Sequence, residues 1–103
     1  MKLVLDTDKY DEYQSIFIND LIERIVIKLR ESGMDGLELE EATAKIAFSI
    51  ASAIDDTAGI ESNGIEVKPY LTFRANDDEI VHYGENSDTH GFVIPALKRL
   101  FDK

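Results

Sequence analysis

The longest amphipathic pattern in the chain runs from Tyr10 to Ser32. This stretch contains no Gly or Pro, and its apolar residues recur every three or four positions, which is typical of an α-helix. The apolar residues that cover about half of the helix circumference are Phe17, Ile18, Leu21, Ile22, Ile25, Val26 and Leu29. We expect Thr7 or Asp8 to cap its N-terminus and Gly33 to end it at a positive φ angle. Such a helix needs partners on more than one side.

A second helix is predicted from Glu38 to Asp56, antiparallel to the first because the connection Met34-Asp35-Gly36 is short. Its predicted main stripe consists of Leu39, Ala42, Ile46, Ile50, Ala53 and Ile54. The segment from Ile46 to Ile54 carries no charge, so this helix is either central in the fold or part of a subunit interface. The interface interpretation predicts a homodimer through Ile46, Ile50 and Ile54.

A period-two pattern follows from Ile65 to Ala75, which predicts a half-buried strand with Val67, Leu71 and Phe73 on its covered face. Pro69 cannot donate to a strand ladder and predicts a bulge or an edge position. With a second strand from Glu79 to Tyr83, the pattern gives a β-hairpin covered by the helices. Residues 1–5 offer a third short strand, and the segment 57–64 has a turn-like composition.

The last predicted helix is interrupted by Pro95. Either Ser87 or Asp88 caps it and Pro95 kinks it, or it begins near Ile94 with Pro95 in its first turn; the pattern favours the earlier start. The expected fold is therefore a single α+β domain over residues 1–103. In this fold an antiparallel helix pair packs on a β-hairpin, a C-terminal helix follows, and the element order is α-α-β-β-α.

The net charge of the chain indicates which classes of partner it can bind. The chain has 21 acidic and 11 basic residues, a net charge of −10, which disfavours nucleic acid and anionic membranes and favours a basic protein. The absence of cysteine excludes disulfides, thiolate zinc sites and cysteine nucleophiles. The N-terminal apolar run, Leu3 to Leu5, is too short for a signal peptide, and no segment is long enough to span a membrane, so a cytoplasmic location is expected.

The N-terminal segment LVLDTD, an apolar run that ends in Asp-x-Asp, resembles the nucleophile motif of the haloacid dehalogenase phosphatases. The resemblance implies that Asp6 attacks and Asp8 serves as acid and base, with Asp55 and Asp56 as metal-binding acids. Only six residues carry it, the Lys and Tyr that follow depart from the family pattern, and 103 residues are too few for the family's parallel sheet. Helix caps and first-turn acids are the simpler interpretation of the same residues.

One loop gathers residue types that bind metal ions. His82, Asp88 and His90 lie within nine residues and together could hold a divalent ion such as Zn²⁺, the one cofactor that the sequence suggests. No Gly-x-Ser-x-Gly elbow or Gly-rich phosphate loop is present. The leading hypothesis is a small, acidic, cytoplasmic, non-enzymatic protein-binding or regulatory module. The alternative is a small metal- or ligand-binding protein, or an enzyme, that uses this loop.

Overall fold

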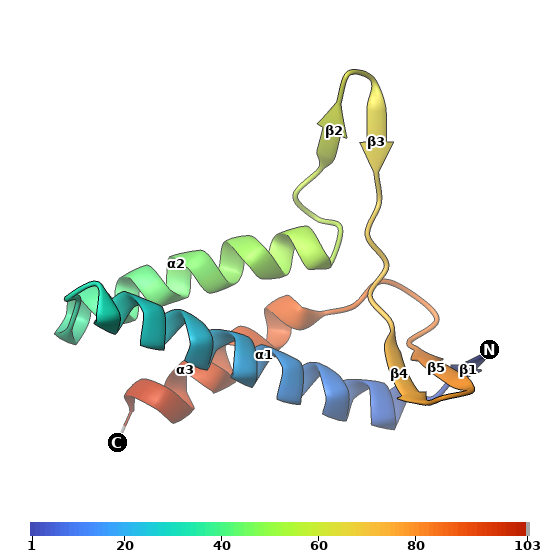
Figure 1. Cartoon of the computed structure of the whole chain (residues 1–103), viewed down its shortest axis with the longest axis horizontal. Coiled ribbons are helices and arrows are strands. Elements are labelled where there is room, and N and C mark those ends of the chain that lie inside the picture. Colours follow the sequence, from blue (N-terminus) through green and yellow to red (C-terminus); the bar gives the residue numbers. More distant parts are fainter. Residues whose placement is uncertain (103) are drawn as a thin grey trace.

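The computed structural model describes residues 1–102 and confirms the expected α+β fold with its α-α-β-β-α order (Figure 1). It also contains the N-terminal strand. The elements are β1 (Lys2–Leu5), α1 (Thr7–Glu31), α2 (Gly36–Ile54), β2 (Ile60–Ser62), β3 (Ile65–Val67), β4 (Phe73–Asn76), β5 (Glu79–His82), the 3₁₀ turn η1 (Thr89–Phe92) and α3 (Val93–Phe101).

Helix α1 begins earlier than its apolar pattern predicts. Asp6 is the N-cap, because its carboxylate accepts a hydrogen bond from the backbone N–H of Lys9 at 3.1 Å; the expected caps Thr7 and Asp8 were wrong. The helix ends as predicted, with Gly33 at a φ of 93°. Its fully buried residues follow a spacing of four: Tyr10, Gln14, Ile18, Ile22 and Val26.

The buried stripe of α2 differs from the predicted one. It consists of Leu39, Thr43, Ala47 and Ala51, whereas Ile46 is 37% exposed and the predicted stripe residues Ile50 and Ile54 are only partly buried. The physical reason is size. Both α1 and α3 pack on α2, and small side chains at the contact allow the helix axes to approach closely. The larger isoleucines are consequently displaced to one side of α2.

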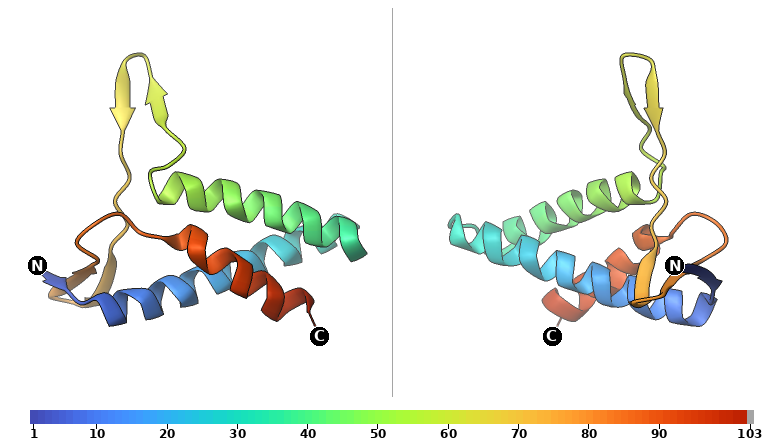
Figure 2. Two further views of the ribbon diagram at one scale, coloured as in Figure 1. Left: turned by 180° about the vertical axis from the view of Figure 1, so that it is seen from behind. Right: turned by 45° about the vertical axis from the view of Figure 1, so that its right-hand side comes forward.

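The three helices form a layer with two unequal sides. Helices α1 and α2 lie antiparallel, and α3 packs across one side of this pair, behind it in Figure 1 and in front of it in the reverse view of Figure 2. The core that they enclose consists of Ile18, Ile22, Val26, Leu39, Ala47, Ala51, Val93 and Ala96. No further layer covers the opposite side of the α1–α2 pair within residues 1–102.

A three-stranded sheet, in the order β1-β5-β4, packs at the N-terminal end of α1. Strand β1 is parallel to β5, which confirms the third short strand, and β4 is antiparallel to β5. The predicted covered residue Phe73 contacts α1: its ring centroid lies 5.2 Å from that of Tyr10 and 5.7 Å from that of Tyr13. This aromatic cluster joins the sheet to the helix layer.

The predicted long strand from Ile65 to Ala75 was wrong, because it forms two strands in two different sheets. Strand pairing stops at Val67 and resumes at Phe73. Pro69, two residues after Val67, has no N–H to donate to a strand ladder. Val67 is consequently 51% exposed instead of covered by the helices. Strand β3 pairs with β2, a strand in the segment expected to be only a turn.

The start of the last helix has features of both predicted alternatives, the cap at Ser87 or Asp88 and the helix start near Ile94. Asp88 caps the short turn η1 by accepting from the N–H of Gly91 at 3.3 Å. The α-helix itself begins at Val93, which places Pro95 in the first turn, where its missing N–H would have had no helical partner anyway.

Candidate functional site: a β-arm and an open helical face

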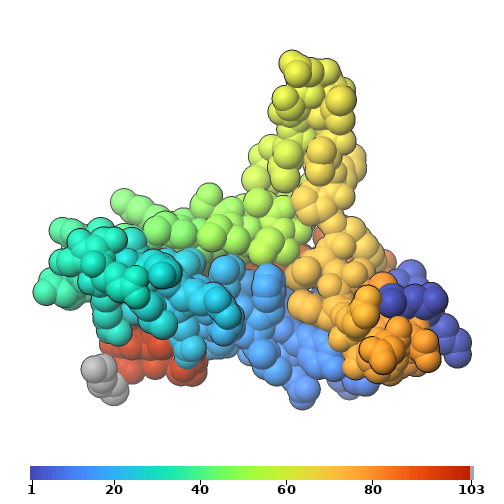
Figure 3. Space-filling view, viewed as in Figure 1, coloured from blue at the N-terminus to red at the C-terminus, as the bar shows by residue number. Residues whose placement is uncertain are grey.

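Strands β2 and β3 form a hairpin, here named the β-arm (residues 57–68), that projects away from the helices (Figure 3). Every residue from 57 to 68 is exposed. The radius of gyration is 15.4 Å, against about 12.8 Å for an ordinary domain of this length, so the arm extends the molecule well beyond a rounded shape. An isolated two-stranded hairpin is only marginally stable in water, and such an element usually gains its stability from something packed on it.

The register of the arm follows from its turn. Asn63 and Gly64 have φ angles of 51° and 80°, which is the left-handed geometry of the two-residue turns that match strand twist. This turn pairs Ser62 with Ile65, Glu61 with Glu66, and Ile60 with Val67. Asn-Gly between short alternating runs is a strong hairpin signal, and it could have revealed the arm from the sequence.

The two faces of the arm differ in chemistry, because successive side chains of a strand point to opposite faces. One face presents Ile60, Ile65 and Val67, of which Ile65 is 67% exposed. The other presents the directly opposed pair Glu61 and Glu66. Like charges directly opposite each other destabilise a hairpin, and Lys68 Nζ, 2.7 Å from Glu66 Oε1, offsets only part of this repulsion.

The base of the arm is anchored by a buried carboxylate. Asp55, the C-cap of α2, is 4% exposed and accepts four hydrogen bonds from the segment that leads into α3. Its Oδ1 accepts from Ser87 Oγ at 2.6 Å, from Thr89 N at 3.0 Å and from Thr89 Oγ1 at 2.8 Å. Its Oδ2 accepts from His90 N at 3.0 Å. Asp55 therefore binds the first backbone N–H groups of η1 from across the fold, beside the cap Asp88, and its oxygens are committed to this structural role.

Helix α1 holds the same segment from the other side. Gln14 is completely buried; its Oε1 accepts from the backbone N–H of Asp88 at 2.8 Å, and its Nε2 donates to Asp11 Oδ1 at 3.0 Å. Tyr10 donates its hydroxyl to the carbonyl of Leu71 at 2.5 Å, and burial raises its pKa to about 12. No buried side-chain nitrogen or oxygen in residues 1–102 is without a partner. The polar interior is thus saturated by the fold.

The predicted metal residues do not converge. His82 lies on β5, with its Nδ1 3.4 Å from the hydroxyl of Tyr70, while the ring of His90 packs on Phe48 with a centroid distance of 4.8 Å. Asp88 caps η1. Within the described part of the chain, no group of three or more His, Asp or Glu side chains gathers in a way that could hold a metal ion. Binding of a divalent ion through His82, Asp88 and His90 stays a prediction.

The structure does bring two acidic segments together. Negative charge on Asp11 of α1, followed by burial and by the charges of Glu85 and Asp88, raises the pKa of Tyr83. Asp6 and Asp8, which resembled a phosphatase motif, lie at the start of α1, where Asp6 is the helix cap. The other two acids in that resemblance are Asp55 and Asp56. Of these, Asp55 is the buried anchor described above, and its oxygens accept hydrogen bonds from Ser87, Thr89 and His90.

Of the three predicted dimer residues, Ile50 and Ile54 are partly buried, whereas Ile46 is exposed and lies on the side of α2 next to α1. A shallow apolar groove runs there between α1 and α2, lined by Leu21, Arg24, Ile25, Lys28, Leu29 and Ile46. A second groove continues along α1 towards the sheet and is lined by Tyr13, Ile16, Phe17, Asp20 and Phe73. We name this side of the helix pair the open face.

No family model, curated protein or solved structure matches the chain. None of the helices within residues 1–102 combines the length and apolar character that crossing a membrane requires.

Proposed function

We propose that this chain is a non-enzymatic protein-binding module that recognises a basic partner protein through its β-arm. The observation that carries the proposal is the arm itself: a hairpin exposed along its whole length, with isoleucine and valine on one face and paired glutamates on the other. Exposed apolar side chains rimmed by polar ones mark protein interaction sites. An extended hairpin can lay such a surface against a partner.

The charge of the arm indicates the chemistry of the partner. A Lys or Arg side chain placed between Glu61 and Glu66 would relieve their cross-strand repulsion, and it would form charge-assisted hydrogen bonds with both carboxylates. The net charge of −10 adds long-range attraction for a basic protein, which raises the association rate and makes it depend on salt. Apolar contact with Ile65 and Val67 would then hold the complex.

The test is affinity capture from the native host's lysate, with the bound protein identified by mass spectrometry and its affinity then measured with purified components. We expect one basic partner, bound more weakly at high salt than at low salt. Glu61→Gln should reduce the association rate, and Ile65→Thr with Val67→Thr should raise Kd by about tenfold or more, equivalent to about 1.4 kcal/mol or more. Threonine keeps the strand propensity of these positions, so the arm itself should persist.

Two matched controls lie away from the arm. Glu12→Gln removes one exposed charge from α1, and Ile27→Thr makes the same apolar-to-polar change at a comparably exposed position of α1. Both should bind as the wild type does. Equal binding at low and high salt, or arm variants that bind like these controls, would overturn the proposal.

A further inference from the structure

The open face of the α1–α2 pair is a second surface without cover, separate from the β-arm. Helix α3 packs on the reverse side of the pair, and the sheet packs at one end of α1. The apolar side chains of the two grooves follow one another along α1, from Tyr13 and Phe17 to Leu21, Ile25 and Leu29, with Ile46 of α2 opposite them. A helix pair that buries only one of its two sides leaves room for a further layer.

The amount of exposed surface points in the same direction. The chain exposes 6816 Å², whereas a folded monomer of 11.6 kDa exposes about 5,800 Å². The surplus of about 1,000 Å² is close to the roughly 800 Å² that each partner buries in a standard protein interface. The β-arm, exposed at every residue from 57 to 68, contributes to this surplus together with the apolar grooves of the open face.

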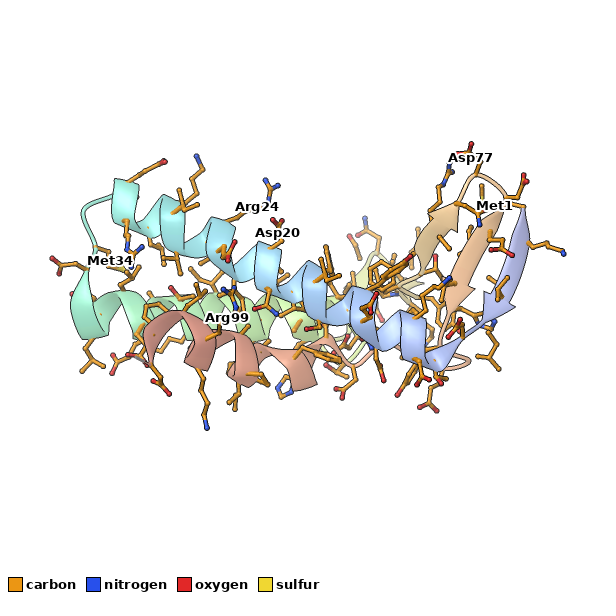
Figure 4. All side chains as sticks on the ribbon, turned by 90° about the horizontal axis from the view of Figure 1, so that it is seen from below. Met1, Asp20, Arg24, Met34, Asp77 and Arg99 are labelled. Carbon is orange, nitrogen blue, oxygen red and sulfur yellow. The ribbon has the colours of Figure 1, made fainter. Side chains whose placement is uncertain are left out.

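The charge of the open face differs from that of the chain as a whole. Although the chain carries −10, α2 has no charged residue from Ile46 to Ile54. The charges beside the grooves form one stripe on α1: Asp20, then Arg24, then Lys28. Figure 4 shows Asp20 and Arg24 projecting from α1 on the side away from α3. A basic partner would find no acidic surplus here, and a second copy of the chain would meet little repulsion.

The two charges at the ends of this stripe are complementary to each other. A two-fold axis that passes near Arg24 and reverses the direction of α1 brings Asp20 of one copy opposite Lys28 of the other, and the reverse pair forms by symmetry. The two Arg24 side chains then lie near the axis, where each has an ion-pair partner in Asp20 of its own helix, 2.6 Å from Arg24 Nε. Both side chains are exposed, with 58% of the Asp20 side chain and 78% of the Lys28 side chain accessible. Each is paired within α1, Asp20 Oδ2 with Arg24 Nε at 2.6 Å and Lys28 Nζ with Glu31 Oε1 at 3.3 Å. Exposed ion pairs of this kind contribute about 0–1 kcal/mol, so a partner across an interface can compete with them.

We propose that a second copy of this chain covers the open face, as a two-fold homodimer. Ile46 lies in its centre together with Leu21 and Ile25, and Asp20–Lys28 pairs form its rim. The α1 and α2 helices of both copies complete a four-helix layer between the two α3 helices. The β-arm is not needed for this contact, so the dimer and the proposed basic partner stand or fall separately.

The test is the mass in solution, measured by sedimentation equilibrium over a wide range of concentrations. The wild type should have twice the 11.6 kDa of one chain. Ile46→Glu should be monomeric with an unchanged helical circular-dichroism spectrum. Leu37→Glu places the same change on the same helix at a more exposed site, 69% against 37%, and should stay dimeric. A monomeric wild type, or a dimeric Ile46→Glu variant, would overturn the proposal.

A second experiment tests the pairing and does not depend on how Ile46→Glu folds, because it changes only exposed charges. Lys28→Glu alone and Asp20→Lys alone each place like charges opposite each other at both rim contacts and should weaken the dimer by about tenfold or more. A mixture of the two variants restores both opposite-charge pairs, so it should form a heterodimer more tightly than either variant self-associates. If mixing gives no gain in mass, the proposed two-fold arrangement is wrong.

Discussion

The buried carboxylate of Asp55 allows a quantitative test of the fold. Replacing Asp55 by Asn keeps the size of the side chain and one oxygen, which can still accept from Ser87 and Thr89 at the Oδ1 position. The amide NH₂ group then replaces Oδ2 and faces the N–H of His90, which is 3.0 Å away in the wild type. Two donors cannot bond to each other, so the change breaks one hydrogen bond and leaves a backbone donor without a partner.

The expected cost follows from these contacts. A buried donor without a partner costs about 1–3 kcal/mol, and the N–H of His90, whose bond is only partly buried, should lie at the lower end of this range. The three remaining hydrogen bonds change from charged to neutral acceptors, and hydrogen bonds to charged groups are roughly twice as strong as neutral ones. Relief from burying a charge offsets part of this loss. We therefore expect a destabilisation of about 2–4 kcal/mol, which for a domain of this size lowers Tm by roughly 10–25 °C.

The assay is urea unfolding followed by circular dichroism, together with a thermal melt. Asp56→Asn is the matched control, because it removes the same charge from the next residue. Asp56 has a φ angle of 62°, a left-handed conformation that Asn tolerates well, and it should change stability by less than about 0.5 kcal/mol. If Asp55→Asn is as stable as Asp56→Asn, the role assigned to the Asp55 hydrogen bonds is wrong.

Three further predictions concern other parts of the molecule. Because burial raises the pKa of Tyr10 to about 12, the folded state keeps a proton between pH 10 and 12 that the unfolded chain releases; stability should fall as pH rises through this window, and Tyr10→Phe should flatten that fall in a series of thermal melts. Gly64→Val places a β-branched residue at a φ of 80° and should disorder the β-arm, seen as lost cross-strand NMR contacts with an unchanged helix signal. If His82, Asp88 and His90 bind Zn²⁺, excess Zn²⁺ should raise Tm and His90→Ala should abolish the rise; an unchanged Tm would show that these side chains, which do not converge in the structure, do not bind the ion.

The helices could be predicted from the sequence because their signals are local. The apolar spacing of α1 and Gly33 at its end depend only on neighbouring residues. For α2, local pattern was insufficient, because hydrophobicity alone ranks Ile46 and Ile50 above Ala47 and Ala51. Which side is buried depends on how closely α1 and α3 approach, and that distance selects small side chains.

The β-structure and the anchor were harder to predict for different reasons. The alternating pattern continues across Pro69, so one long strand fitted the sequence as well as two short ones. Pairing with Ile60–Ser62 decided between them. The role of Asp55 has no local signal at all, because its hydrogen-bond partners lie 32 to 35 residues further along the chain. Only the tertiary fold brings a helix C-cap to the start of η1.

Helix α2 connects the two proposed surfaces, and this determines how variants should be read. Ile46 of α2 lies on the open face. At the C-terminal end of α2 the chain turns into the β-arm, with Asp56 in the left-handed conformation and Thr57 N donating to Ser52 O at 2.9 Å. Asp55 fixes that end to η1. A change at Asp55 should therefore disturb the base of the arm and the position of α3 together, whereas Glu61→Gln or Ile46→Glu acts on one surface. Loss of partner binding in Asp55→Asn, at a temperature where the protein is folded, would show that the direction of the arm matters as well as its side chains.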